Sequence, residues 1–317
     1  MFTKSQKSIS YFDEKSIIPK KEIEMIEDTV HLILTRFNLA IRFGCNRRFD
    51  SNVPAEKPWL DADYLKKRFE IFEKYTFPSF QSQTEKEFKW IVMFHSDTPE
   101  SFKKRIKELK LRMEQFCPIF LDDEECEKMA VILQEYICKN YNGKRIITTR
   151  VDNDDAVHLT FVENIQRDIV ENVKQSNTVL TYVNGLQYDI RNKRALKYEY
   201  ANNHFLSLYV SDVKANNHIL FYNHDDISKI VQNNQMQIVK KNTKIPLWVE
   251  VITENNFSNT PRWRFSSVMI PYETEKDYPL LLFKWNTKAG WLLHWCTGIC
   301  QVFFQRGKGL FRMIFSR

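Results

Sequence analysis

The sequence predicts an α/β protein with a mostly parallel central sheet and helices on both of its faces. Short apolar runs alternate with segments in which apolar residues recur at helical spacing, and this alternation is typical of parallel sheets. Polar residues follow several of the predicted strands, where such folds bind their ligands. The chain has 317 residues, 43% of them hydrophobic, which suffices for one large domain with an appendage or for two small domains.

The first predicted elements are a strand at residues 31–35 and a helix at about 61–76. Large apolar residues of the helix fall on one face, and Asp61 or Asp63 can cap its start. Pro78 is expected to end the helix, because proline lacks the amide hydrogen that a helix interior needs.

A second strand is predicted at 90–94, and Pro99 with Glu100 marks the start of the next helix. A third strand at 118–121 is followed by a helix over roughly 123–140.

The fourth strand, at 145–149, runs directly into an acidic loop. A helix with apolar residues at i, i+4 spacing follows the loop, at Val157, Phe161, Ile165 and Ile169. Later strands are predicted between Asn-rich loops, at 179–183, 205–210, 219–222 and 247–252.

Composition excludes several classes of protein. Of the net charge of +7, residues 281–317 contribute +6, because they hold six basic residues and no acid. The main domain is therefore nearly neutral, which argues against nucleic-acid binding. Neither Gly-rich phosphate-binding motif occurs among the 7 glycines. The 6 cysteines form no C-x-x-C pair, so free thiols in a reducing cytoplasm are expected.

The acidic loop is the strongest candidate for chemistry. Asp152, Asp154 and Asp155 place three carboxylates within four residues at a strand end. Such a cluster is costly unless a cation neutralises it, and oxygen ligands suit Mg²⁺ or Mn²⁺. The alternative is a solvated acidic turn that caps the helix near residue 156.

Several blocks in this order resemble a family of bacterial rhamnosyltransferases. The blocks cover roughly residues 30–260, and T-T-R-V-D-N-D-D-A at 148–156 is the most specific of them. The supporting blocks are HLILTRFN at 31–38, RFEIFEKYTFPS at 68–79, WIVMF at 90–94 with DTP at 97–99, FLSL at 205–208, and WVEV at 248–251 with NFSN at 256–259.

The resemblance implies a GT-A-like (Rossmann-like) fold and a hexosyltransferase that uses a dTDP-, UDP- or GDP-sugar. Residues 1–28 would be a polar leader, 30–175 the nucleotide-sugar-binding half and 176–280 the acceptor-binding half of one domain. Asp152, Asp154 and Asp155 would hold the metal and the diphosphate. Other residues at strand ends would contact the donor: Thr35, Arg36 and Asn38 at the nucleotide, Asp97 at the base or ribose, and Arg150 at the phosphates or the acids. Each of these polar residues could instead make a local cap or surface contact.

The chain departs from the family near residues 251–254, where members often carry a His that would be a third metal ligand. Here the sequence continues Thr-Glu-Asn-Asn from Thr253. Either Glu254 substitutes, or the ion has fewer protein ligands, or the enzyme works without a tightly bound metal. An inverting transfer from dTDP-β-L-rhamnose would also need a base, and the candidates are Asp225, Asp226 and Glu250. Asp225 could instead cap a helix at 226–232, and Glu250 could lie on the solvated face of a strand.

The C-terminal segment 281–317 is basic and aromatic. Its 17 uncharged residues between Lys288 and Arg306 are marginal for a membrane span, which needs about 20 apolar residues. An interfacial helix with basic anchors fits better, and a pair of helices docked on the core is the alternative.

The expected function is sugar transfer to a glycan or lipid-linked acceptor in surface-polysaccharide synthesis. The enzyme would be cytoplasmic, peripheral on the inner face of the bacterial cytoplasmic membrane. A Mg²⁺-dependent nucleotidyltransferase and a non-catalytic glycan-binding protein are the alternatives. The first usually needs an early triphosphate loop that is missing here, and the second gives the acidic loop no purpose.

Overall fold

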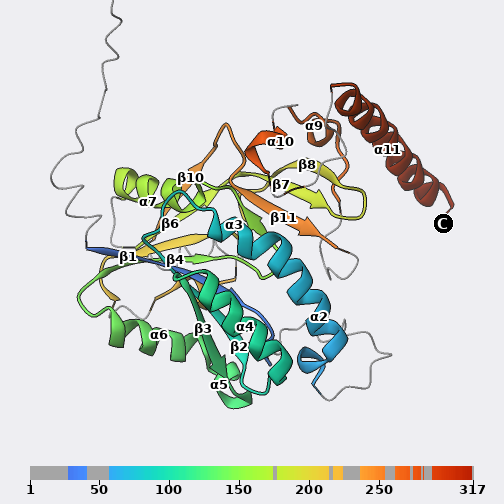
Figure 1. Cartoon of the computed structure of the whole chain (residues 1–317). Helices are drawn as coiled ribbons and strands as arrows, with labels where there is room; N and C mark the ends of the chain where they lie inside the picture. Colours follow the sequence, from blue (N-terminus) through green and yellow to red (C-terminus); the bar gives the residue numbers. More distant parts are fainter. Residues whose placement is uncertain are drawn as a thin grey trace, which may run out of the picture.

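The computed structural model contains two sheets that pack into one α/β body, with a long helix at the C-terminus (Figure 1). It describes residues 28–40, 57–173, 177–213, 217–223, 236–253, 261–271, 274–279, 281 and 288–315.

The larger sheet has seven strands in the order β10-β6-β9-β4-β1-β2-β3. Neighbours run parallel except β9, which is antiparallel to both β4 and β6. The strands are β1 (Thr29–Arg36), β2 (Lys89–His95), β3 (Phe116–Leu121), β4 (Arg145–Arg150), β6 (Asn177–Tyr182), β9 (Ser207–Val210) and β10 (Gln237–Lys241). This arrangement confirms the predicted α/β class with its mostly parallel sheet.

Helices cover both faces of this sheet and enclose two apolar cores. One core contains side chains of α2 (Ala62–Ile71), α4 (Glu100–Arg112) and α7 (Phe161–Asn172). The other is covered by α5 (Asp123–Glu127) and α6 (Met129–Asn140). The helix predicted over 123–140 is thus two helices that meet at Lys128.

The helix that starts at Ala62 does not end at Pro78, contrary to the prediction. It continues as the π-helical segment η2 (Phe72–Thr76) and then as α3 (Phe77–Gln81). In η2 the amide of Phe77 bonds to the carbonyl of Phe72, five residues back. Pro78 therefore stands in the first turn of a new helical segment, where its missing amide hydrogen is not needed.

Two other predictions were wrong because strand pairing in one case and a capping hydrogen bond in the other override the sequence pattern. Val157 belongs to the short strand β5 (Ala156–Val157), where it pairs with Trp248, and the helix begins later, at Phe161. Residues Ile219–Phe221 form the 3₁₀ helix η4 instead of a strand, because the His218 side chain accepts a bond from the Leu220 amide at 3.2 Å.

The smaller sheet has four strands in the order β5-β11-β7-β8. It contains β7 (Asn184–Asp189), β8 (Arg194–Glu199) and β11 (Trp248–Ile252). The Trp248 ring lies directly on Gly185 of β7, where a Cβ atom would come within 2.2 Å of the ring carbons. Glycine is therefore required at this position.

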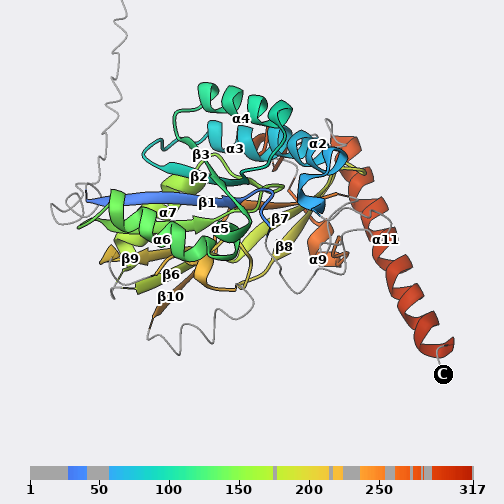
Figure 2. The same ribbon diagram turned by 90° about the horizontal axis from the view of Figure 1, so that it is seen from below.

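After β11 the chain forms α9 (Phe265–Val268) and α10 (Thr274–Asp277), and the C-terminal segment forms α11 (Lys288–Phe315). The first half of α11 docks on the body, where Trp291 and Trp295 donate from Nε1 to the carbonyl of Ile270 at 2.8 and 3.2 Å. Val302 is buried against Val268. The end of α11 extends away from the sheets (Figures 1 and 2). Among the described residues, no helix is both long and apolar enough to cross a membrane.

Candidate functional site

The acidic loop leaves the carboxyl end of β4 and is held from three sides. Asp155 is buried, its Oδ1 accepts a hydrogen bond from the amide of Val251 at 3.0 Å, and its Oδ2 accepts one from His204 Nε2 at 2.6 Å. Because Val251 belongs to β11, this carboxylate connects the larger sheet to the smaller one.

Asp152, Asp155 and His204 can together hold a cation. Each offers one ligand atom, and these atoms all lie within 4.8 Å of one another. Two carboxylate oxygens and one imidazole nitrogen form a donor set that suits Mn²⁺ well and Mg²⁺ less well. The three residues therefore fit the divalent cation that the sequence resemblance predicted.

The Asp152 carboxylate is also surrounded by positive charge. Arg150 donates to it through Nε and Nη2, at 3.2 and 3.1 Å, and Arg36 Nη2 lies 3.8 Å away. Burial raises the pKa of Asp152, but the charges of Arg150, His204 and Arg36 outweigh burial and hold its pKa well below the usual range. Arg36 and Arg150 thus compensate the negative charge of this carboxylate.

His204 and Asp155 form a hydrogen-bonded pair, and each shifts the pKa of the other. Burial lowers the pKa of His204, but the charges of Asp155 and Asp152 outweigh burial and raise it above its ordinary value. For Asp155, burial raises the pKa, and the imidazolium acts against that effect.

Asp154 points away from this cluster. Its Oδ2 accepts a hydrogen bond from Arg68 Nη1 at 3.0 Å, and both side chains are largely buried. The sequence grouped Asp154 with Asp152 and Asp155; the structure brings only the last two together and adds His204.

Asn153 fastens the loop to its surroundings. Its Nδ2 donates to the carbonyls of Arg36 and Phe37 at 2.9 and 2.8 Å, and its Oδ1 accepts from Arg68. Thr76, in the π-helical segment, donates from Oγ1 to the Asn153 carbonyl at 3.1 Å. The departure from regular helix at η2 therefore lies beside the site, as π-helical segments often do.

The remaining donor-site candidates are placed differently. Thr35 is fully buried and donates to the Val151 carbonyl at 2.8 Å. Asn38 is buried, with its Nδ2 on Thr98 Oγ1 at 3.0 Å. Asp97 is exposed at the carboxyl end of β2 and lies 3.5 Å from Lys57 Nζ. Of these three side chains, only Asp97 faces solvent for a ligand to contact.

Of the candidate bases, only Glu250 lies within the described residues, since Asp225 and Asp226 lie outside them, as does Glu254. Glu250 is buried, and its Oε2 accepts a hydrogen bond from Gln187 Nε2 at 2.5 Å. All five residues of β11 are buried. The interpretation of Glu250 as part of a solvated strand face is therefore wrong.

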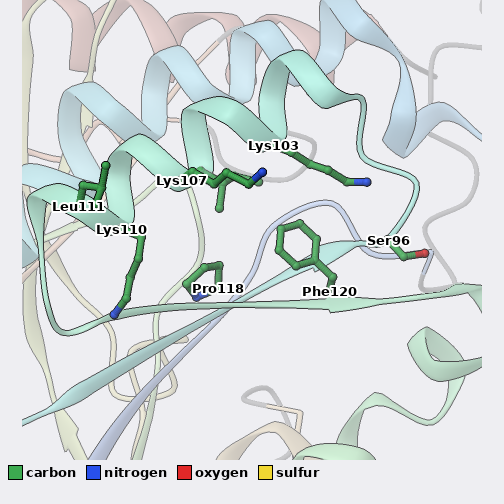
Figure 3. Close-up of a pocket in the computed structure, with 8 residues that line it drawn as sticks. Ser96, Lys103, Lys107, Lys110, Leu111, Pro118 and Phe120 are labelled. Atoms are coloured by element: carbon green, nitrogen blue, oxygen red, sulfur yellow. The ribbon is translucent and has the colours of Figure 1, made fainter.

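A groove of about 530 Å³ lies apart from the acidic loop, between α4 and the edge strand β3 (Figure 3). Lys103, Lys107 and Lys110 line it on the helix, and Pro118 and Phe120 on the strand. Its lining contains no acid, His or Cys.

The parallel sheet with one antiparallel strand next to β4, and the carboxylates that follow β4, agree with the GT-A-like fold that the sequence predicted. The family model described as "Putative rhamnosyl transferase" matches residues 30–264, and the chain belongs to this family. A comparison with curated proteins gives no match.

Two crystal structures are similar to the chain at a low level. S. aureus TarS 1-349 shares 9% identity at a TM-score of 0.39, over 70% of this chain and 60% of that chain. A second S. aureus TarS structure shares 10% identity at a TM-score of 0.33, over 71% and 37%. This chain thus spans 60% of the length of the first structure and 37% of the length of the second.

Proposed function

We propose that this glycosyltransferase moves a sugar, rhamnose by the family description, from a nucleoside diphosphate to a glycan or lipid-linked acceptor. The observation that carries the proposal is the cluster of Asp152, Asp155 and His204 at the carboxyl end of β4, in a chain matched over 30–264 by the family model. Arg36 and Arg150 lie against the same carboxylate.

Each group at the site has a defined part in this proposal. A divalent cation bound there would neutralise charge that develops on the diphosphate leaving group. Arg36 and Arg150 orient the diphosphate through charge-assisted hydrogen bonds. Glu250 remains the candidate base within the described residues, because β11 passes beside Asp155 and Gln187 fixes the position of its carboxylate.

A nucleoside diphosphate is expected to stabilise the protein, and more strongly with Mn²⁺ than alone. Ligand at 100 times its dissociation constant adds about 2.7 kcal/mol. Thermal unfolding measured with UDP, dTDP and GDP, each with and without Mn²⁺, tests this. Unchanged melting with all three at millimolar concentration would count against a nucleotide-sugar enzyme.

We further propose that the enzyme works at the inner face of the cytoplasmic membrane, in surface-polysaccharide synthesis, held there by α11. Leu292, Leu293, Phe303 and Phe304 are 53–63% exposed. At helical spacing these four side chains share one face of α11 with the exposed Cys296 and Cys300. This face is opposite the one that docks on the body. In the sequence, the same spacing continues at Leu310, Phe311 and Ile314. An apolar face on a helix with basic and no acidic residues fits an anionic lipid surface.

The variant Leu293→Glu/Phe303→Glu is expected to lose most of its binding to anionic vesicles, because it places charge in the apolar face. Flotation with phosphatidylglycerol vesicles at low salt measures this. Deletion of 281–317 is a poorer test, since it would uncover Val268 where Val302 is buried. Wild-type protein that stays at the bottom of the gradient, or a variant that floats equally well, would contradict membrane binding.

A further inference from the structure

A continuous row of rings leads from the candidate metal site across the smaller sheet. The centroid of His204 lies 4.4 Å from that of Phe205, and Phe205 stacks on Trp248 at 5.1 Å. Trp248 meets Tyr198 edge-on at 5.6 Å, and Tyr198 stacks on Tyr200 at 5.8 Å. These contacts place Tyr198, on the edge strand β8, on the same side of the smaller sheet as His204.

A line of hydrogen bonds reaches the same place from Glu250. Gln187 donates to the Glu250 carboxylate and accepts from the amide of Arg262 at 2.8 Å. The Arg262 guanidinium lies over the Tyr198 ring at 4.9 Å and the Tyr200 ring at 5.8 Å. Arg262 is thus fixed at the far end of both lines of contact.

Positive charge gathers around a small pocket at this end of the sheet. Its lining includes Lys197, Arg262 and Arg264, together with Ser266 and Glu199. Within the part of the chain that the structure describes, none of the three cationic side chains forms an ion pair. By contrast, the three arginines around the acidic loop each pair with one of its carboxylates: Arg36, Arg68 and Arg150.

We propose that this pocket binds a phosphate group of the acceptor. Lys197 of β8 forms it together with Arg262 and Arg264, which lie directly before α9. The inference rests on the proposed function and specifies its acceptor as a phosphate-bearing molecule. Two guanidinium groups offer paired donors for phosphate oxygens. The acceptor hydroxyl would then extend from the pocket towards Glu250 and His204.

The shared chemistry is a phosphate ester or diphosphate, which a lipid carrier or a soluble glycan phosphate could supply. Calorimetric titration of the full chain with farnesyl diphosphate, inorganic pyrophosphate and farnesol separates these sources. Tighter binding of farnesyl diphosphate than of pyrophosphate supports the site with a lipid-linked acceptor. Equal binding of both supports it with a soluble one.

The variant Arg262→Gln/Arg264→Gln is expected to weaken diphosphate binding at least tenfold, while the melting temperature stays the same. Glutamine removes the charge but keeps the Arg262 backbone amide that donates to Gln187. The matched control Lys104→Gln/Lys139→Gln changes two exposed lysines on α4 and α6 and is expected to have no effect.

The donor site also attracts diphosphate, so Asp152→Asn/Arg150→Gln is titrated in parallel. Diphosphate binding that is lost in this variant and unchanged in Arg262→Gln/Arg264→Gln overturns the acceptor-phosphate proposal. The stabilisation by nucleoside diphosphates tests the proposed function separately. A chain that binds no nucleotide but binds diphosphate through Arg262 and Arg264 would contradict only the proposed function.

Discussion

Replacing Asp155 by Asn is expected to lower sugar transfer about 10³-fold, which corresponds to about 4 kcal/mol of transition-state stabilisation. The Asp155 carboxylate is shared by His204 and the Val251 amide. Asparagine keeps an oxygen for the Val251 amide but turns an NH₂ group towards His204. The charge that a cation needs is therefore lost, while the link between the sheets is kept. Steady-state transfer and thermal unfolding of the variant measure the two effects.

Asp168→Asn is the matched control for this variant. Asp168 is equally a buried carboxylate, with Oδ2 on the Tyr182 hydroxyl at 2.8 Å, but it belongs to α7 and lies outside the acidic cluster. Its replacement is expected to reduce stability and to leave turnover of the folded protein nearly unchanged. If Asp155→Asn also turned over within a few-fold of the wild type, the cation site would be placed elsewhere.

The parts of the fold that the sequence predicted are those with strong local patterns. The four parallel strands β1 to β4 are short apolar runs bounded by polar residues, and each was found close to its predicted position. The hairpin of β7 and β8 was missed, because Lys197 and Glu199 face solvent within β8 and interrupt the apolar pattern. The helix continues past Pro78 through a π-helical hydrogen bond from the Phe77 amide to the Phe72 carbonyl. Helix propensities of single residues do not predict such a bond.

The candidate site was predicted in part for the same reason. Asp152 and Asp155 directly follow a strong strand and lie three positions apart in the sequence. His204 lies 49 positions after Asp155 in the sequence. Spacing alone therefore does not predict that the two side chains meet. A signal was nevertheless present: His204 directly precedes the matched block at 205–208. Because β9 is antiparallel to β4, its first residues lie at the carboxyl end of β4, where the acidic loop begins.

Arg68 and Asn153 were missed because their roles are to hold other groups. Arg68 stands on α2, 85 residues before Asn153, and nothing in its helix distinguishes it from other exposed-face arginines. Only the structure shows its guanidinium turned inwards onto Asp154 and Asn153.

Replacing Arg68 by Met is expected to destabilise the protein by about 3 kcal/mol, because it leaves the largely buried Asp154 carboxylate without its partner. The melting temperature should fall by roughly 5 °C. The control Arg105→Met breaks a similar but more exposed pair with Glu73 and should cost less than about 1 kcal/mol. Thermal and urea unfolding of both variants measure the difference.

The double variant Arg68→Met/Asp154→Asn then decides between two roles for Asp154. Removing both charges should restore most of the lost stability, since no buried charge is left unpaired. If Asp154 serves only as the partner of Arg68, sugar transfer should recover together with stability. If Asp154 also binds the cation or the donor, the double variant should be stable and inactive. A double variant no more stable than Arg68→Met alone would contradict the ion pair itself, because the destabilisation would then come from the lost contact between Arg68 and Asn153.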